Sequence, residues 1–224
     1  MKKNSVSAKA RVMLVDDHAV VRDGLAQLLG GEDDLTVCGE AGSAEEAVQV
    51  ADKCKPELAI VDITMGGVNG IELIKNLKAM QPKLAVLVLS MHDEEHYAER
   101  ALRAGANGYV MKREARERIM KAIRTVLAGE LYVSERIQKT LMHQYFHGSG
   151  GKAESPISRL SDRELEVLTL LGKGLSSKDI GDRLHLSPKT VDSHRTHMKE
   201  KLALAGAPEL IRFAYDWVTS QELA

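Results

Sequence analysis

The chain has few cysteines, no long apolar run and almost no net charge. It contains 2 cysteines, Cys38 and Cys54, which argues against a scaffold built on disulfides, and we expect two buried, inert thiols. The longest apolar runs, such as residues 84–89, fall far short of the roughly 18 residues that span a bilayer. The basic start is followed by polar residues and not by an apolar leader. We therefore expect a cytoplasmic protein with no membrane partner.

The formal net charge is −1, from 31 basic and 32 acidic residues. This balance gives no long-range attraction for a phosphate polymer, so any nucleic-acid binding must come from local placement of charge. With 44% hydrophobic and 28% charged residues, the composition is that of an ordinary globular protein. A length of 224 residues favours one large or two small domains.

Glycine, serine and proline gather in residues 148–156, which predicts a flexible linker between two domains. Before this linker, short aliphatic runs alternate with stretches of helical periodicity that start near His18, Ser43, Gly70, Glu94 and Arg113. The runs that we interpret as strands are residues 12–15, 35–38, 58–63, 84–89 and 108–111. Strands that alternate with helices predict a doubly wound α/β domain with a five-stranded parallel sheet.

After the linker the pattern is helical throughout, which predicts a second, all-α domain. The expected helices are residues 162–171, 177–184, 188–202 and 208–219. Ser161 followed by Glu164 has the pattern of a capping box, and Ser187 followed by Pro188 that of a capped helix start. Residues 131–147 are expected to form a connecting helix. His143 and His147 in this helix have a metal-binding spacing, but without a third ligand nearby we expect solvated side chains.

Chemically related polar residues lie at the ends of four of the predicted strands. They are Asp16 and Asp17, Asp62, Ser90 and Lys112. Each alone is compatible with an ordinary turn or helix cap, but the carboxyl ends of parallel strands meet at one crevice. Three carboxylates there would repel one another without a hard cation, which favours Mg²⁺. Asp62 lies centrally and can accept a phosphoryl group, with a lysine and a hydroxyl to stabilise the transferring oxygens.

Residues 9–128 resemble a bacterial response-regulator receiver domain. The motifs that carry the resemblance are VMLVDDH at 12–18, DITM at 62–65, Ser90 and GYVMK at 108–112. The resemblance implies a flavodoxin-like sheet of order 2-1-3-4-5 and Mg²⁺ as cofactor. The residues it assigns are the phosphoacceptor Asp62, the metal ligands Asp16, Asp17, Asp62 and the Thr64 carbonyl, and the phosphoryl and switch contacts Ser90, Tyr109 and Lys112. Tyr109 also fits an aromatic residue packed at a sheet edge.

Three residues depart from the family's usual pattern. Gly66 and Gly67 follow Met65 where the family commonly has proline, and Arg113 follows Lys112 where proline or an acidic or small residue is frequent. Glycine relaxes the loop that proline would stiffen, so we expect the phosphoryl lifetime and the switching amplitude to differ from the family's. His18, beside the acidic pair, is expected to be a surface or capping residue and not a catalytic base.

The predicted helix over residues 188–202 has two unlike faces. Val191, Met198 and Leu202 form an apolar stripe, while Lys189, Ser193, Thr196 and Glu200 lie opposite. A short connection at residues 185–187 joins it to the preceding helix, as in helix-turn-helix units. Residues 152–224 carry 11 basic and 11 acidic side chains, so we expect weak binding by a monomer and a need for a second copy.

Residues 157–220 resemble a LuxR-type four-helix DNA-binding domain. The motifs are LSDRELEVL at 160–168, GKGLSSKDI at 172–180 and LSPKTVDSH at 186–194. The whole chain thus resembles a NarL/FixJ-type transcriptional response regulator, with a receiver domain at 9–128, a connector and linker at 129–156 and a DNA-binding domain at 157–224. The implied base contacts are Asp192, Ser193 and Thr196, and the implied phosphate contacts are Lys178, Lys189, Thr190 and Lys199. Asp192 stands where many relatives have lysine.

The combined prediction is a transcription factor switched by phosphorylation. We expect a sensor histidine kinase to phosphorylate Asp62, and the phosphorylated protein to bind a double-stranded DNA operator as a homodimer. One alternative is a phosphohydrolase with an aspartyl intermediate, but Thr64 stands where such an enzyme would have a second acid, so we expect no turnover of an external substrate. Two others are a DNA-binding regulator that needs no phosphorylation and has a vestigial acidic pocket, and a second domain that binds proteins.

Overall fold

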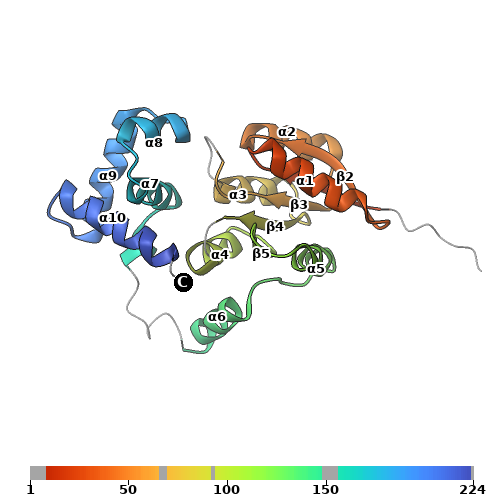
Figure 1. Ribbon diagram of the computed structural model, residues 1–224. Coiled ribbons are helices and arrows are strands. Elements are labelled where there is room, and N and C mark those ends of the chain that lie inside the picture. The colour runs from red at the N-terminus through yellow and green to blue at the C-terminus, as the bar shows by residue number, and fades with distance from the viewer. Residues whose placement is uncertain (1–8, 66–69, 92–93, 148–155, 223–224) are drawn as a thin grey trace, which may run out of the picture. The chain divides into compact units, whose positions relative to one another are not determined.

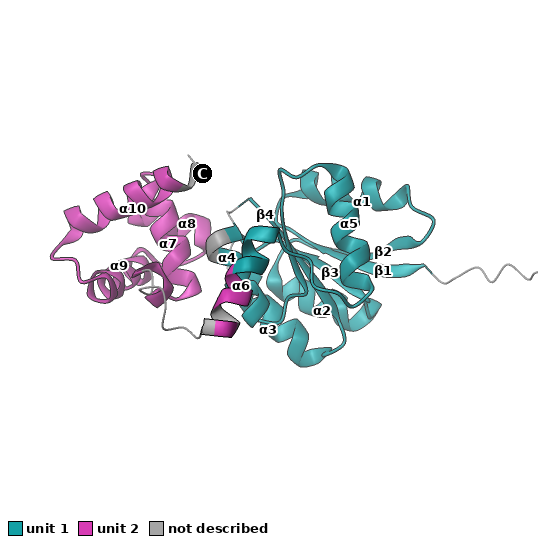
Figure 2. Ribbon diagram, turned by 90° about the horizontal axis from the view of Figure 1, so that it is seen from below, with its two compact units in different colours: residues 1–139 teal, residues 140–224 magenta. Residues whose placement is uncertain are grey.

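The computed structural model describes residues 9–65, 70–91, 94–147 and 156–222. The chain forms two compact units, residues 1–139 and residues 140–224, drawn in separate colours in Figure 2. Each unit has its own buried apolar core. Within the described ranges, no helix has the length and apolar character that crossing a membrane requires. Residues 148–155 of the predicted linker lie outside the described residues.

The first unit contains a five-stranded parallel sheet (Figure 1). Its strands are β1 (Ala10–Val15), β2 (Leu35–Ala41), β3 (Leu58–Val61), β4 (Ala85–Ser90) and β5 (Gly108–Met111). The order is β2-β1-β3-β4-β5, which confirms the predicted topology. Every residue of β3 and β5 is buried, as expected for strands covered on both faces.

Helices cover both faces of this sheet, which confirms the doubly wound class (Figure 2). They are α1 (Ala19–Gly30), α2 (Ala44–Cys54), α3 (Gly70–Met80), α4 (Glu94–Arg103) and α5 (Arg116–Leu127). Leu29 of α1 and Ile123 of α5 belong to one apolar cluster, so these two helices share a face. Helices α2, α3 and α4 contact one another in succession on the other face.

The predicted connecting helix begins later than expected. Residues 131–134 are not helical: the Tyr109 N–H donates to the Tyr132 carbonyl at 2.9 Å, and the Tyr132 N–H donates to the Asn107 carbonyl at 3.0 Å. The open edge of β5 offers backbone partners here that a helix would forgo. Helix α6 (Glu135–His147) follows, with Ile137 buried and His143 exposed. The side chain of His147 lies outside the described residues.

The second unit is helical within its described part, as predicted. It contains the 3₁₀ turn η1 (Pro156–Arg159) and helices α7 (Asp162–Gly172), α8 (Ser177–Leu184), α9 (Pro188–Leu202) and α10 (Ala207–Glu222). Ser161 and Glu164 form the predicted capping box, and the Ser187 side chain caps α9 ahead of Pro188. Helix α10 packs against α7, and α8 against α9, so the short helices share one core.

Candidate functional sites

Two buried carboxylates lie side by side at the carboxyl end of the sheet. Asp16 follows β1 and is 2% exposed, while Asp62 follows β3 and is 4% exposed. The Asp62 N–H donates to the Val15 carbonyl at 2.8 Å, which fixes the two strand ends against each other. Ligand atoms of Asp16, Asp17, His18 and Asp62 all lie within 4.8 Å of one another. The parallel register therefore brings the three predicted carboxylates together.

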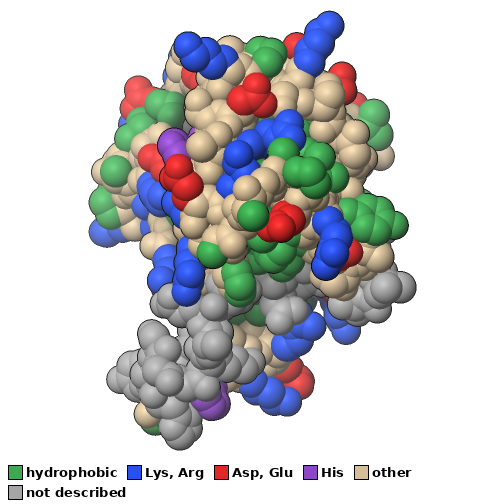
Figure 3. All heavy atoms as spheres, turned by 90° about the vertical axis from the view of Figure 1, so that its left-hand side faces the viewer, with side chains coloured by type: hydrophobic (Ala, Val, Ile, Leu, Met, Phe, Trp, Pro, Cys, Tyr) green, Lys and Arg blue, Asp and Glu red, His purple; other side chains and the backbone are tan. Residues whose placement is uncertain are grey.

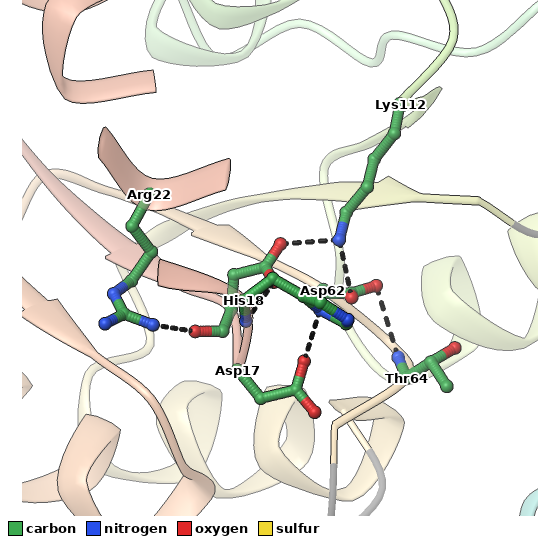
Figure 4. Close-up of polar contacts among 7 residues, drawn as sticks. Asp17, His18, Arg22, Asp62, Thr64 and Lys112 are labelled. Atoms are coloured by element: carbon green, nitrogen blue, oxygen red, sulfur yellow. Dashed lines mark hydrogen bonds and ion pairs between the residues drawn. The ribbon is translucent and has the colours of Figure 1, made fainter. Parts of the chain in front are cut away.

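Lys112 joins these carboxylates across the crevice. Its Nζ atom lies 2.5 Å from Asp16 Oδ2 and 2.7 Å from Asp62 Oδ2 (Figure 4). The Lys112 N–H donates to the Ser90 carbonyl at 2.7 Å, so the end of β4 holds the lysine in place. One ammonium group thus serves two buried carboxylates, and one negative charge remains without a cation of its own.

The shortage of positive charge at the two carboxylates shifts the pKa values of the site. Burial raises the pKa of the Asp62 carboxyl to about 6, against the opposing effect of Lys112, and the neighbouring Asp16 adds to the rise. Burial alone would lower the pKa of Lys112, but Asp62 and Asp16 outweigh it and raise that pKa. Lys112 therefore stays charged at neutral pH, while Asp62 is a carboxylate whose charge the protein stabilises poorly.

The backbone after Asp62 is held close to the start of α3. The Thr64 N–H donates to Asp62 Oδ1 at 3.2 Å, and the Gly70 N–H donates to the Ile63 carbonyl at 3.0 Å. A Cβ atom on Gly70 would lie 2.3 Å from the Asp62 carbonyl oxygen, so only glycine permits this approach. Gly66 and Gly67, for which we predict a relaxed loop, lie outside the described residues.

Two side chains that we did not assign to the site contact its acidic pair. His18 Nδ1 lies 2.7 Å from Asp17 Oδ1, and the His18 N–H donates to Asp16 Oδ1 at 2.9 Å. His18 occupies the N-cap position of α1, as expected, but its side chain makes no capping hydrogen bond. Arg22 Nη1 donates to the Asp16 carbonyl at 2.5 Å (Figure 4). The sequence feature that could have identified Arg22 is its position in the first turn of the helix that follows the acidic pair.

The donor set fits a hard divalent cation. Asp16, Asp17 and Asp62 offer carboxylate oxygens from one small region, and oxygen ligands of this kind suit Mg²⁺. The Thr64 hydroxyl beside them is buried and has no hydrogen-bond partner among the described residues. Charge repulsion and an unpaired polar atom thus mark a place where a cation with bound water would be stabilised.

The predicted switch residues lie on β4 and β5, next to this crevice. Ser90 is fully buried and is paired in the ladder with Met111, directly before Lys112. Tyr109 is 1% exposed and is paired with Val88, two residues before Ser90. This burial fits either a switch aromatic or one packed at the edge strand. Arg113 is exposed.

Helix α9 presents the predicted nucleic-acid contacts on its outer face. Val191 and Met198 are buried and Leu202 is half-buried, which confirms the predicted apolar stripe. Exposed are Lys178 of α8 and Lys189, Thr190, Asp192, Ser193 and Thr196 of α9, while Lys199 of α9 is half-buried. On the face of the second unit drawn in Figure 3, Lys and Arg side chains are interspersed with Asp and Glu side chains. Binding through this face would therefore depend on short-range contacts.

A polar network joins α9 to α8. The Ser177 hydroxyl donates to Asp192 Oδ1 at 2.7 Å, and Arg195 Nη1 donates to Ser177 Oγ at 2.7 Å. Asp192 thus has a partner within the unit, which the sequence pattern did not predict, and Arg195 was not among the predicted contacts. The network fixes the angle between the two helices that form the helix-turn-helix unit.

Comparison with known proteins agrees with this geometry. Residues 12–124 match the response regulator receiver domain family, and residues 158–214 match the bacterial regulatory proteins of the luxR family. The chain is 36% identical over 208 residues to the oxygen regulatory protein NreC of Staphylococcus haemolyticus, covering 91% of this chain and 96% of that protein.

Solved structures of response regulators resemble the chain along nearly all of its length. The RcsB response regulator of Salmonella typhimurium is 26% identical, with a TM-score of 0.68, covering 93% of this chain and 98% of that one. RcsB from Salmonella enterica serovar Typhimurium bound to the promoter rprA in the presence of the phosphomimetic BeF3- is 27% identical, with a TM-score of 0.62, over 92% of this chain and 98% of that one. With its receiver and LuxR-type domains in this order, the chain belongs to the NarL/FixJ-type response regulators, the transcriptional regulators of two-component systems.

Proposed function

We propose that Asp62 accepts a phosphoryl group from a sensor histidine kinase and that this reaction controls dimerisation and operator binding. The observation that carries the proposal is the pair of buried carboxylates that share Lys112. Burial raises the pKa of Asp62 to about 6, so its carboxylate is poorly stabilised where a nucleophile is needed. Since the proposed target is the cell's DNA, we expect the protein in the cytoplasm.

The transfer forms one bond and breaks one bond. An Asp62 carboxylate oxygen attacks the phosphorus of the kinase phosphohistidine, the P–N bond breaks, and the histidine leaves. Lys112 is placed to stabilise the oxygens of the transferred group, and Ser90 lies at the adjacent strand end to donate a hydrogen bond. Mg²⁺ bound by Asp16, Asp17, Asp62 and the Thr64 carbonyl would neutralise the negative charge that the three carboxylates and the phosphoryl group share.

The added charge supplies the switch. A phosphoryl group brings roughly one to two further negative charges beside Lys112, which must move from the two carboxylates toward the new oxygens. Ser90 and Tyr109 lie on the strands that bear this rearrangement. The second unit is small and formally neutral, so two linked copies on paired half-sites would bind DNA far more tightly than one. Homodimerisation is thus the step that phosphorylation would control.

The proposed DNA contacts lie on α8 and α9. Phosphate groups would be bound by Lys178, Lys189, Thr190 and Lys199, and base edges would be contacted by Asp192, Ser193 and Thr196. The RcsB structure with the promoter rprA was formed with a phosphomimetic, which supports the link between acceptor and DNA. No turnover of an external substrate is expected, because a stoichiometric change of charge is all that this switch requires.

The test is the intact mass of the protein after incubation with Mg²⁺ and acetyl phosphate. We expect one phosphoryl adduct in the wild type and in Asp33→Ala, a control at an exposed aspartate, and none in Asp62→Ala. Size-exclusion chromatography and DNA binding, measured on the same samples, should then change only where the adduct forms. Equal dimerisation and DNA binding by the wild type with and without the adduct would favour the phosphorylation-independent regulator instead.

A further inference from the structure

The two cysteines of the chain lie against each other in the first unit. Cys38 belongs to β2 and Cys54 is the last residue of α2, and their Sγ atoms are 3.2 Å apart. Both residues are half-buried, and both are free thiols. From the sequence we expect two buried, inert thiols, but both are only half-buried, and their spacing along the chain does not predict the contact. The fold makes the pair by laying α2 alongside β2 (Figure 1).

Cys38 points from β2 toward α2. Val37 packs on the other side, with the apolar cluster of α1 and α5, so the alternation of the strand places Cys38 on the α2 side. In the ladder between β1 and β2, Val12 is paired with Val37 and Met13 with Gly39, so Cys38 is the extra residue of a bulge and Gly39 also lies toward α2. Strand β2 is at the edge of the sheet, so within the described residues only β1 pairs with it.

Gly39 lets the end of α2 come close to the bulge. A Cβ atom at this position would lie 2.4 Å from Val50 Cγ1 and 3.3 Å from Cys54 Sγ. A side chain here would displace Val50 and crowd Cys54, which disfavours the close approach of α2 to the strand. Strand alternation therefore points Cys38 at the helix, and the bulge and Gly39 allow Cys54 to reach it.

The pair is stable as thiols under reducing conditions. Burial raises the pKa of the Cys54 thiol to about 11, and the contact with Cys38 adds to the rise. The thiol is therefore protonated at neutral pH and reacts slowly with weak oxidants. Closing the present separation of 3.2 Å to a disulfide bond of about 2.05 Å requires a movement of only about 1 Å. Cys54 ends its helix, so this movement displaces no later helical turn.

We propose that Cys38 and Cys54 are a redox-modification site that forms a reversible intramolecular disulfide on exposure to an oxidising low-molecular-weight disulfide. One cysteine thiolate attacks the small disulfide, forms a mixed disulfide and releases one small thiol. The second cysteine thiolate then attacks the protein sulfur of that mixed disulfide and releases the other small thiol. The two protein thiols are oxidised, one small disulfide is reduced to two thiols, and the released thiols take up the two protons.

The bond would join β2 to α2 away from the acidic crevice. Val15, which precedes Asp16, is paired with Ala41, three residues beyond Cys38, so the pair lies about 10 Å from the crevice along the strand. We therefore expect the oxidised receiver to be more stable and still able to accept a phosphoryl group. This inference does not depend on the proposed phosphorylation, and either can fail without the other.

The test uses the full-length protein treated with excess oxidised glutathione at neutral pH and then alkylated. We expect a monomer that has lost two hydrogen atoms, with the Cys38–Cys54 link found by peptide mapping, and full reversal by dithiothreitol. Closing this short loop should raise the Tm of the receiver by about 5–10 °C. Cys38→Ser and Cys54→Ser should show no intramolecular link and no difference in Tm between oxidised and reduced samples.

Three results would overturn the inference. They are two alkylatable thiols after prolonged oxidation, a stable glutathione adduct on one cysteine of the wild type, and a link only between two chains. To show that the variants remain folded, the reduced double variant Cys38→Ser/Cys54→Ser should match the reduced wild type in circular dichroism. A Gly39→Ala variant sharpens the test, because a displaced helix should reduce the yield of the link while both cysteines remain.

Discussion

Both units of the protein bury a carboxylate against a lysine, and the two pairs behave in opposite ways. Lys112 Nζ lies 2.7 Å from Asp62 in the receiver, and Lys201 Nζ lies 2.7 Å from Glu164 in the DNA-binding unit. Asp62 is 4% exposed and Glu164 is 3% exposed. Yet the pKa of Asp62 is raised to about 6, whereas that of Glu164 is lowered. Burial and distance to a cation therefore do not by themselves decide whether the pKa of a carboxyl group is raised or lowered.

The difference lies in what else each carboxylate contacts. Burial also works to raise the pKa of Glu164, but hydrogen bonds from Lys201 and from Ser161 outweigh it. Glu164 is in the first turn of α7, where the helix dipole favours a negative charge, and it accepts from the Ser161 N–H at 2.7 Å. Asp62 shares its lysine with Asp16 and has a weaker backbone bond of 3.2 Å from Thr64. The receiver therefore leaves the charge of Asp62 under-stabilised, which supports the proposed acceptance of a phosphoryl group.

The largest expected effect comes from removing each lysine. Lys112→Met leaves two buried carboxylates without their cation and should lower the free energy of unfolding of the receiver by about 3–5 kcal/mol. Lys201→Met should cost the DNA-binding unit only about 1 kcal/mol, because Lys201 is 39% exposed and the helix start still stabilises Glu164. Hydrogen exchange of the β3 amides measures the stability of the receiver. The fluorescence of Trp217, the single tryptophan, measures unfolding of the DNA-binding unit. Equal costs would contradict the comparison.

A second test acts on the backbone beneath Asp62. Gly70→Ala places a Cβ atom 2.3 Å from the Asp62 carbonyl oxygen and 2.6 Å from Ile63 Cα, neither of which is a flexible side-chain end. We expect a loss of about 1–3 kcal/mol in receiver stability and slower phosphorylation, because the Asp62 backbone must shift. Gly24→Ala is the matched control, since nothing lies within 4 Å of its new Cβ atom and alanine favours a helix. It should leave phosphorylation unchanged and slightly raise the Tm.

A third test uses the opposite pKa shifts. The raised pKa of Asp62 contributes stability that is fully present below its unfolded value of about 4 and is lost as the pH rises through about 6. The lowered pKa of Glu164 contributes stability that is present above its unfolded value and is lost as the pH falls through its folded value.

Unfolding measured without Mg²⁺ from pH 7 to pH 4 should therefore reveal the two contributions separately. Asp62→Asn should remove a stabilisation of the receiver that grows as the pH falls through 6. Glu164→Gln should remove a stabilisation of the DNA-binding unit that weakens toward acid pH. Variants that shift both unfolding curves by the same amount at every pH would show that the two carboxylates do not differ in this way.

The sequence predicted five strands and the residues at the strand ends because both follow from one-dimensional patterns, whereas the order of the strands was implied by the resemblance to receiver domains. Apolar runs alternate with amphipathic ones, and Asp16, Asp62 and Lys112 directly follow such runs. The extended segment around Tyr132 was missed because it depends on an open strand edge elsewhere in the chain. The contact of Cys38 with Cys54 was missed because it depends on where the end of α2 packs against β2. Such contacts depend on how helices and strands pack against one another, which the pattern of residues along the sequence does not show.

The smallest expected effect on stability comes from a third carboxylate, which is neither buried nor under-stabilised. Asp192 is 63% exposed, accepts from the Ser177 hydroxyl at 2.7 Å and lies 3.9 Å from Arg195. Asp192→Asn keeps the shape and one acceptor oxygen, so we expect the free energy of unfolding to change by less than about 0.5 kcal/mol. Base preference should change instead, because a carboxylate only accepts hydrogen bonds whereas an amide also donates them.

Binding of the wild type and of Asp192→Asn to a library of randomised DNA sites separates these effects. We expect a different preferred base at one position of each half-site and an unchanged dependence of binding on salt concentration. Lys178→Ala is the control, since loss of a phosphate contact should weaken binding to all sites and lower the salt slope by about one. If Asp192→Asn left the base preference unchanged but loosened the unit, its role would be to hold α8 against α9, and it would then resemble Glu164 more than Asp62.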